Sequence, residues 1–248
     1  MQLVFDFPPM PRYSFDNFVV CGGNRAAWHF TRQLVAGDGT ENLLYLYGPP
    51  GSGKTHLLAA AGEVLSGSAG KPAPFISFRT IDEIYRGDYA AERVSRLGEH
   101  FLDAPALLVD DIHLMPDTES LRVEVWQLFN DFYGAGKKIM VTGMFPPKEL
   151  PNLDDHLISR LLWGLVAKVD ITDDESRGMI LSKLAEDRQV LLPDDVADYL
   201  LTIVRRDVPS LREALERINR HALTEGRKIT LRLAREADRK STRLNSSH

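Results

Sequence analysis

The chain has 248 residues with 44% hydrophobic, 26% charged and 8% aromatic side chains, a composition that excludes a disordered, collagen-like or disulfide-stapled protein. Its formal net charge is −5, its single cysteine, Cys21, excludes an internal disulfide, and no apolar run approaches the roughly 18 residues that a membrane span needs. We therefore expect a cytoplasmic protein with one large domain or two small ones and no membrane partner.

An extended arm is expected at residues 1–12, where three prolines remove backbone hydrogen-bond donors between apolar side chains. From residue 43 onwards, apolar runs alternate with helical patterns. The runs expected to form strands are 43–47, 74–78, 106–109, 138–142 and 165–171. The patterns expected to form helices are 54–65, a helix-rich stretch to about 102, 121–133 and 154–162. Apolar strands separated by helices predict a parallel α/β sheet.

No strand-like run follows residue 172, and the C-terminal part of the chain is expected to be all helical. The expected helices are 174–188, 194–205, 210–225 and a fourth from about 230. Thr172 and Glu175 form the T-x-x-E pattern of a capping box, which predicts the start of the first of these helices. The sequence therefore predicts an α/β base domain at 13–172, a small helical domain at 173–240 and a disordered tail at 241–248.

Charge is unevenly distributed along the chain. Residues 205–248 carry 12 Lys and Arg against 6 Asp and Glu, a net charge of +6 in a protein that is negative as a whole. Such a segment indicates either contact with nucleic acid or an acidic protein surface, or simply a solvated face of the helices. Both interpretations stay open.

The segment from Gly48 to Thr55 reads GPPGSGKT and fits the phosphate-loop pattern G-x-x-x-x-G-K-[ST]. It follows an expected strand and opens an expected helix, so that backbone N–H groups and the helix N-terminus can surround a phosphate. Lys54 is expected to reach the β and γ phosphates, and the Thr55 hydroxyl to ligate Mg²⁺. The alternative is an incidental glycine-rich turn. The residues expected to hold the nucleotide here are Gly48, Pro49, Pro50, Gly51, Ser52, Gly53, Lys54 and Thr55.

A second motif supports the first. The apolar run 106–109 leads directly into Asp110 and Asp111, at the end of a strand where parallel sheets place their ligands. Asp110 is the expected Mg²⁺ carboxylate of a P-loop NTPase, and Asp111 is placed to orient or polarise the attacking water. The alternative is a pair of surface acids that end a strand.

Together with three further segments, these motifs resemble the AAA+ ATPases, and within them the DnaA/Hda family. The segments that carry the resemblance are FDNFVVCGGN at 15–24, the phosphate loop, LLVDDIH at 107–113, VTGMFPPKEL at 141–150 and ISRLLWG at 158–164. The resemblance covers about residues 13–238 and implies an AAA+ P-loop NTPase with a parallel-sheet base and a small helical lid. It also implies ADP or ATP with Mg²⁺ as ligands, and contact of Val19 and Val20 with adenine.

The family resemblance also implies head-to-tail association of AAA+ domains, including homo-oligomers, in which Arg160 reaches the γ-phosphate of a neighbouring protein. The alternative is an Arg160 that is salt-bridged within its own helix. At the sensor 1 position, Met144 stands where the family has an aspartate, and at sensor 2 Pro209 stands where it has an arginine. Arg212, one helical turn later, is expected to substitute in the nucleotide site. We therefore expect weak intrinsic hydrolysis with binding retained.

The N-terminal hexapeptide QLVFDF resembles the peptide by which replication proteins dock on the β sliding clamp. The expected clamp-binding residues are Gln2, Leu3, Phe5 and Phe7. The alternative is that these apolar side chains pack against their own domain. Because the helix-turn-helix domain of the family's initiators is missing after the lid, contact with nucleic acid is expected mainly through the clamp.

The resemblance implies a bacterial regulator that binds nucleotide, is tethered to the DNA-loaded clamp and promotes hydrolysis of ATP bound to the DnaA initiator. It is expected to act more as a hydrolysis-promoting partner than as an enzyme. One alternative is a DnaA-type or helicase-loader ATPase that binds single-stranded DNA directly. The other is a scaffold in which nucleotide only rigidifies the contact between base and lid.

Overall fold

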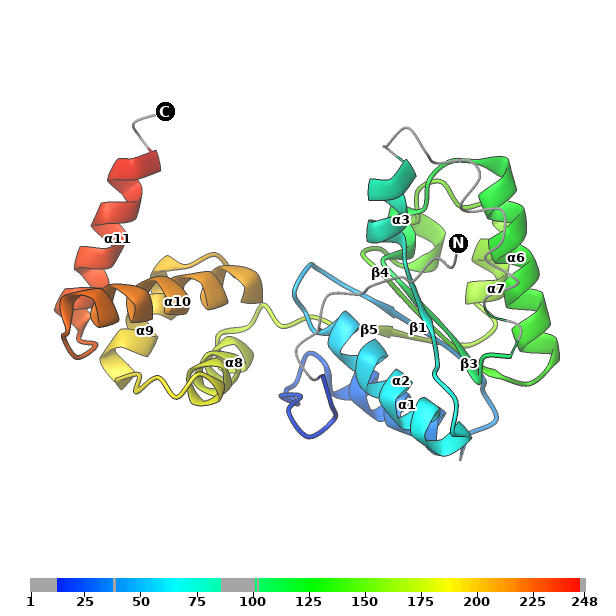
Figure 1. Ribbon diagram of the computed structural model, residues 1–248, viewed down its shortest axis with the longest axis horizontal. Helices are drawn as coiled ribbons and strands as arrows, with labels where there is room; N and C mark the ends of the chain where they lie inside the picture. Colours follow the sequence, from blue (N-terminus) through cyan, green and yellow to red (C-terminus); the bar gives the residue numbers. More distant parts are fainter. Residues whose placement is uncertain (1–12, 38, 86–100, 102, 246–248) are drawn as a thin grey trace. The chain divides into compact units, whose positions relative to one another are not determined.

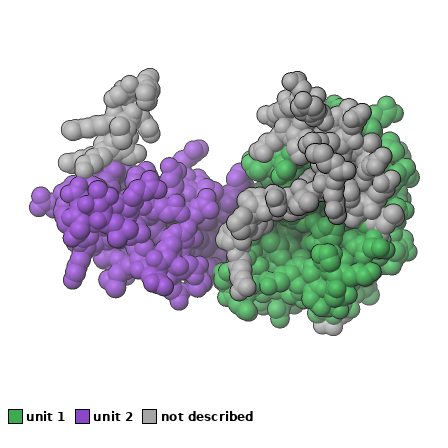
Figure 2. All heavy atoms as spheres, viewed as in Figure 1, with its two compact units in different colours: residues 1–18, 26–48, 53–169 green, residues 19–25, 49–52, 170–248 purple. Residues whose placement is uncertain are grey.

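The computed structural model describes residues 13–37, 39–85, 101 and 103–245. The chain divides into two compact units (Figure 2). The first unit comprises residues 1–18, 26–48 and 53–169, and the second comprises 19–25, 49–52 and 170–248. The arm at 1–12, with its expected clamp-binding residues, lies outside the described residues, and so do residues 246–248.

The first unit is built on one parallel sheet, whose strand order in the described part of the chain is β2-β3-β4-β1-β5 (Figure 1). Its strands are β1 (Leu43–Tyr47), β2 (Phe75–Ser77), β3 (Ala106–Asp110), β4 (Lys138–Gly143) and β5 (Leu165–Lys168). The predicted parallel α/β sheet is thereby confirmed. Because all strands run the same way, the loops that follow β1, β3 and β4 meet at one edge of the sheet.

Alternate residues of each strand face opposite layers of helices. Leu43 and Tyr45 pack in one buried cluster, and Leu44 and Leu46 pack in the other. The helices α1 (Arg25–Ala36) and α2 (Lys54–Ala69) cover one face of the sheet, and α3 (Phe78–Tyr85), α6 (Glu119–Gly134) and α7 (Asp155–Leu161) cover the other (Figure 1). The short helices η1 (Ile112–Leu114) and η2 (Pro147–Glu149) follow β3 and β4. The unit is therefore a three-layer α/β/α structure.

The structure differs from the sequence analysis at several element boundaries and in one additional helix; β5, for example, ends at Lys168 and not at residue 171. β2 is shorter than the expected run 74–78, since Pro74 has no N–H to donate and Phe78 already begins α3. The helix α1 was not among the expected elements, although its buried residues Ala27, Thr31 and Leu34 have the spacing of an amphipathic helix.

The second unit contains four helices in its described C-terminal part, which confirms the expected all-helical lid. They are α8 (Asp174–Asp187), α9 (Asp194–Ile203), α10 (Val208–Glu225) and α11 (Leu231–Asn245). Their buried apolar faces form one core. α11 includes residues 241–245, which were expected in a disordered tail. Its first turns are anchored in the core by Leu233, Ala234 and Ala237, and once a helix is nucleated, each further residue adds a backbone hydrogen bond without a new nucleation cost.

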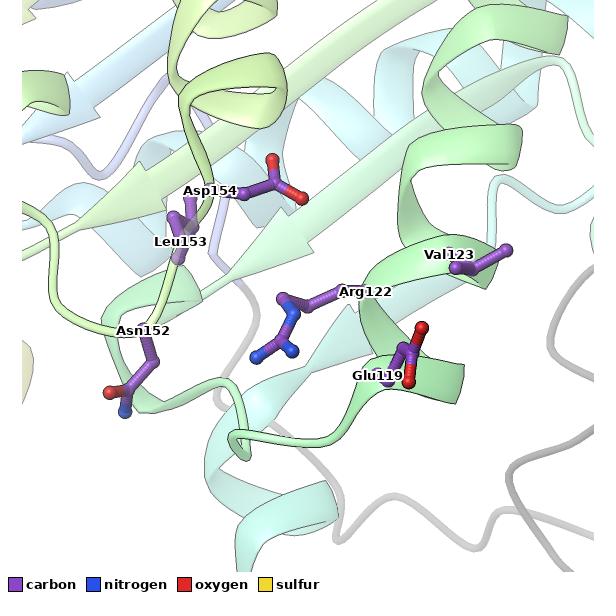
Figure 3. Close-up of a pocket in the computed structure, with 6 residues that line it drawn as sticks. All are labelled: Glu119, Arg122, Val123, Asn152, Leu153 and Asp154. Atoms are coloured by element: carbon purple, nitrogen blue, oxygen red, sulfur yellow. The ribbon is translucent and has the colours of Figure 1, made fainter.

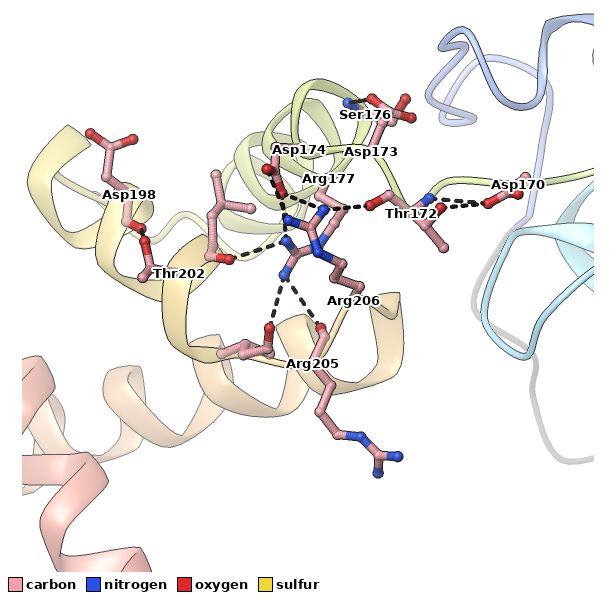
Figure 4. Close-up of polar contacts among 12 residues, drawn as sticks. Asp170, Thr172, Asp173, Asp174, Ser176, Arg177, Asp198, Thr202, Arg205 and Arg206 are labelled. Atoms are coloured by element: carbon pink, nitrogen blue, oxygen red, sulfur yellow. Dashed lines mark hydrogen bonds and ion pairs between the residues drawn. The ribbon is translucent and has the colours of Figure 1, made fainter.

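The predicted capping box at the start of α8 is wrong. The N-cap is Asp173, whose carboxylate accepts a hydrogen bond from the Ser176 N–H at 2.7 Å, while the Thr172 hydroxyl donates to Asp170 at 2.8 Å (Figure 4). That backbone N–H holds the pKa of Asp173 below its usual value. An aspartate caps as well as a threonine and adds a favourable charge at the helix N-terminus, so the cap lies one residue later.

A buried arginine, Arg177, joins α8 to the C-terminal end of α9 (Figure 4). Its side chain is fully buried, and its guanidinium donates to Asp174 Oδ1 at 2.9 Å. It also donates to the carbonyl oxygens of Leu201, Val204 and Arg205 at 3.1, 3.1 and 3.3 Å, at and just after the C-terminal end of α9. A cation satisfies carbonyls that a helix end leaves without partners. No local sequence pattern indicated this role, because the carbonyls lie on another helix.

Replacement of Arg177 should therefore destabilise the second unit. Arg177→Met keeps much of the side-chain volume but leaves buried carbonyls without donors, so we expect the free energy of unfolding to fall by about 3 kcal/mol. Urea unfolding followed by circular dichroism measures the change. Arg232→Met is the matched control, because Arg232 is exposed and pairs with Glu236 in the same unit. Equal unfolding midpoints for the two variants would contradict the structural role of Arg177.

Candidate nucleotide-binding site

The phosphate loop follows β1, and its glycines have conformations that other residues avoid. Gly48 has φ 152°, and a Cβ atom at this position would lie 2.1 Å from the Val169 carbonyl oxygen. Gly53, at the start of α2, has φ 101°, and its Cβ would lie 2.9 Å from the Phe18 ring. A side chain would therefore collide with backbone at Gly48, and at Gly53 it would strain the left-handed backbone and displace the Phe18 ring. The sequence places glycine where the loop turns most sharply.

Lys54 is the first residue of α2 and is only 7% exposed. Its ammonium group donates to the Gly48 carbonyl at 2.8 Å, across the loop. Burial lowers the pKa of Lys54, and the nearby carboxylates Asp111 and Asp110 oppose this shift. The cation thus lies where the loop closes on itself, which is the position that a phosphate-binding lysine requires.

Asp110 ends β3 and is 4% exposed. The Thr55 hydroxyl donates to its Oδ2 at 2.9 Å, and the Thr142 hydroxyl donates to its Oδ1. Burial raises the pKa of Asp110, and these two hydrogen bonds oppose the shift. The structure brings together Thr55 and Asp110, the expected Mg²⁺ ligands. Hard oxygen donors beside a buried carboxylate fit a divalent cation, whose charge would offset the cost of burial.

Asp111 adopts a left-handed conformation, with φ 54°. Its backbone N–H donates to the Thr142 hydroxyl at 3.0 Å. Its Oδ2 accepts hydrogen bonds from Arg79 Nε at 3.2 Å and Nη2 at 3.1 Å. His113 Nδ1 lies 3.9 Å from Asp111 Oδ1, and burial lowers the pKa of His113. Arg79 on α3 therefore occupies one oxygen of the carboxylate expected to act on water.

Sequence reasoning missed Thr142 and Arg79. Thr142 is fully buried, and its hydroxyl contacts both consecutive aspartates. The pairing of Val109 with Val141 in adjacent parallel strands places Thr142 beside Asp110. The available signal was a polar residue at the end of a buried strand. This signal points to Asp110 only when it is known that β3 and β4 are neighbours in the sheet. Arg79 had no such signal, because its contact depends on the packing of α3.

Arg160, the expected arginine finger, lies on α7. Its guanidinium carbon is 3.7 Å from the centroid of the Trp163 ring. Within the described ranges, no carboxylate forms an ion pair with Arg160, so the alternative of a salt bridge in its own helix finds no partner there. Met144, at the sensor 1 position, follows β4 and is 37% exposed. Its thioether cannot act as the carboxylate that the family has there.

The residues expected near adenine lie in the second unit. Val19 and Val20 are half-buried, and they precede a turn that the buried Asn24 holds. Asn24 donates to the Val19 carbonyl at 2.8 Å and accepts from the Cys21 N–H at 2.9 Å. The side-chain amide thus fixes the backbone of the segment that carries the two valines.

The sensor 2 region is the first turn of α10. Asp207 is its N-cap and accepts from the Ser210 N–H at 2.7 Å. Pro209 suits this first turn because its missing N–H has no intrahelical partner there. In the same unit, a Cβ at Gly51 would lie 2.1 Å from Pro209 Cδ. Arg212, the expected substitute, is exposed on α10.

A surface hollow of about 460 Å³ lies elsewhere in the first unit, between the start of α6 and the connection to α7 (Figure 3). It is lined by Glu119, Arg122, Val123, Asn152, Leu153 and Asp154. Arg122 points into the space and forms an ion pair with Asp117. None of the expected site residues lines this hollow. Separately, no helix in the described part of the chain is long and apolar enough to cross a membrane.

Comparison with known protein families matches both parts of the chain. Residues 10–168 match the family model of the bacterial DnaA ATPase domain, and residues 174–237 match that of the Hda lid domain. The chain belongs to the DnaA/Hda family of AAA+ ATPases. The family predicted from the motifs is thereby confirmed.

Individual relatives agree with this assignment. The chromosomal replication initiator DnaA of Enterococcus faecalis is 33% identical over 92% of this chain and 51% of its own length. The DnaA protein of Geobacter sulfurreducens is 35% identical over 91% of this chain and 51% of its own length. The chain therefore spans about half the length of the curated relatives it matches.

Solved structures confirm the predicted AAA+ fold. Domain III of Thermotoga maritima DnaA has a TM-score of 0.78 at 28% identity, covering 92% of this chain and 95% of that one. AMPPCP-bound DnaA from Aquifex aeolicus has a TM-score of 0.72 at 25% identity, covering 84% of this chain and 65% of that one. The Holliday junction motor RuvB of Thermotoga maritima, at 16% identity and a TM-score of 0.64, shares the fold alone.

Proposed function

We propose that this chain is a cytoplasmic regulator of bacterial chromosome replication that promotes hydrolysis of ATP bound to the DnaA initiator. The observation that carries the proposal is Arg160, a partly exposed arginine that is stacked on Trp163 and forms no ion pair with a described residue. In a family whose AAA+ domains associate head to tail, such a cation can enter a neighbour's nucleotide site. There it would stabilise the charge that develops on the transferred phosphoryl group.

The chain's own site is proposed to bind ADP or ATP with Mg²⁺. Lys54 would contact the β and γ phosphates, and Thr55 and Asp110 would hold the metal ion. Bound Mg²⁺ would neutralise phosphate charge. The hydrogen bond between Thr55 and Asp110 supports this pairing, and a relative of similar fold binds AMPPCP. Val19 and Val20 are proposed to contact adenine.

Hydrolysis of the chain's own nucleotide is proposed to be weak. Met144 and Pro209 occupy the sensor positions, and only Arg212 is available near the second one. Arg79 occupies one oxygen of Asp111, which limits the access of a water molecule to this carboxylate. The protein would thus keep its nucleotide as a structural ligand and act on the nucleotide of a partner. The same head-to-tail geometry would also allow homo-oligomers.

The N-terminal arm is proposed to bind the β sliding clamp through Gln2, Leu3, Phe5 and Phe7. Extended peptides bind through a few apolar anchors, so Gln2→Ala combined with Leu3→Ala should eliminate co-elution with the clamp. ADP binding and the melting temperature should not change. Met10→Ala, in the same arm but outside the hexapeptide, is the matched control. Retained clamp binding, or a clearly earlier melting transition, would show that these side chains belong to the protein's own core.

An omission experiment tests the proposed function. ATP-loaded initiator is mixed with this protein, DNA and clamp, and each component is left out in turn. The proposal expects rapid hydrolysis only in the complete mixture. A direct DNA-binding ATPase would instead bind single-stranded DNA without the clamp, with an affinity that falls steeply as salt rises. A scaffold would leave the initiator's ATP intact in every mixture.

A further inference from the structure

The contact between Arg160 and Trp163 is built by local structure. α7 ends at Leu161, and the Trp163 N–H donates to the Arg160 carbonyl at 3.0 Å, which turns the indole back over the arginine side chain. Trp163 also packs edge-on against Tyr133 of α6, with 5.2 Å between ring centroids. The ring is thus held by two elements, yet 47% of the residue stays exposed.

Stacking holds a guanidinium without consuming its hydrogen-bond donors. All five N–H groups of an arginine lie in the guanidinium plane, whereas an aromatic ring contacts the face. A separation of 3.7 Å between the guanidinium carbon and the ring centroid is a stacking distance. Among the described residues, the Arg160 guanidinium donates to no oxygen. An ion pair would fix the same side chain but would occupy the donors that a phosphate needs.

We propose that Trp163 is a positioning residue that holds Arg160 ready for the phosphates of a partner's nucleotide. The inference rests on the proposed function. A free arginine must order several rotatable bonds when it contacts a phosphate, and the stacked side chain has lost much of that freedom beforehand. Leu162, the C-cap of α7, is 43% exposed and adds apolar surface at the end of the helix that carries Arg160. A docked partner would exclude water from this surface, which strengthens both the stacking and the contact with phosphate.

The test measures single-turnover hydrolysis of initiator-bound ATP as each variant is titrated into a mixture with clamp and DNA. Trp163→Ala should lower the maximal rate about tenfold, which lies between the effects of exposed and desolvated cation–π contacts. The half-saturating concentration should change by less than about twofold. Trp163→Phe keeps an aromatic face and should restore most of the rate. Trp126→Ala is the matched control, since Trp126 is 38% exposed on α6 and no described cation stacks on it.

Trp163→Leu separates positioning from packing. Leucine preserves apolar contact with Tyr133 but has no π face, so it should fold, bind ADP and still show the lowered rate. A Trp163→Leu or Trp163→Ala variant that folds and stimulates at the wild-type rate would overturn the inference. A change confined to the half-saturating concentration would also overturn it, because the ring would then be only a docking contact.

Arg160→Ala, measured in parallel, distinguishes failure of this inference from failure of the proposed function. If Arg160→Ala stimulates like the wild-type protein, the proposed function fails. If Arg160→Ala is inactive while the Trp163 variants stimulate normally, only the positioning role is overturned. The inference is supported when Arg160→Ala is inactive, the Trp163→Ala and Trp163→Leu variants are slow and Trp163→Phe is restored.

Discussion

Arg160→Ala should retain nucleotide and clamp binding but lose stimulation of the initiator's ATP hydrolysis, with a fall of about 10³-fold or more. The reason is that an arginine finger acts on the transition state in a neighbouring site, where its charge has no substitute. The side chain forms no ion pair with a described residue, so its removal should not affect folding. Single-turnover hydrolysis of radiolabelled ATP on the initiator measures the effect.

Two further variants sharpen this prediction. Arg160→Lys keeps the positive charge but loses the planar fork of donors, so it should recover only a small part of the rate. Arg122→Ala removes an arginine of the same unit that pairs with Asp117, and it should stimulate normally. Unfolding of Arg160→Ala, or normal stimulation by it, would show that Arg160 has a structural role in its own chain.

Lys54→Ala should abolish adenine-nucleotide binding by the isolated protein. Lys54 contributes the buried cation that faces the Gly48 carbonyl across the loop, and without it the loop itself would offer a phosphate only N–H dipoles. Isothermal titration with ADP and Mg²⁺ measures the loss. Lys71→Ala is the matched control, because Lys71 is exposed just beyond the end of α2. Unchanged ADP affinity in Lys54→Ala would contradict the assignment of the phosphate site.

Local chemistry explains which parts of the site the sequence predicted. The phosphate loop and the two aspartates are short, contiguous segments whose glycines, lysine and carboxylates have direct chemical meaning. The apolar runs predicted the parallel sheet because the inner strands β1, β3 and β4 are buried on both faces and therefore read as nearly continuous apolar segments. The order β2-β3-β4-β1-β5 depends on contacts between distant segments, which periodicity does not report.

The contacts that the sequence analysis missed join residues far apart in the chain. Arg79 contacts Asp111 only because α3 packs beside η1, and Arg177 reaches carbonyls that lie on and after another helix. At the start of α8, two overlapping capping patterns competed, and the aspartate at 173 prevailed over the threonine at 172. These outcomes depend on three-dimensional neighbours or on small energy differences between adjacent caps.

The central claim is that this chain acts on a partner's nucleotide and preserves its own. The most direct measurement loads the initiator and this protein with ATP carrying different phosphorus isotopes at the γ-phosphate and follows both labels in one clamp- and DNA-containing mixture. The account predicts rapid release of phosphate from the initiator, with turnover in this protein far below the roughly 10 s⁻¹ that is typical of enzymes. Release mainly from this protein's own site, with the initiator's ATP intact, would contradict it.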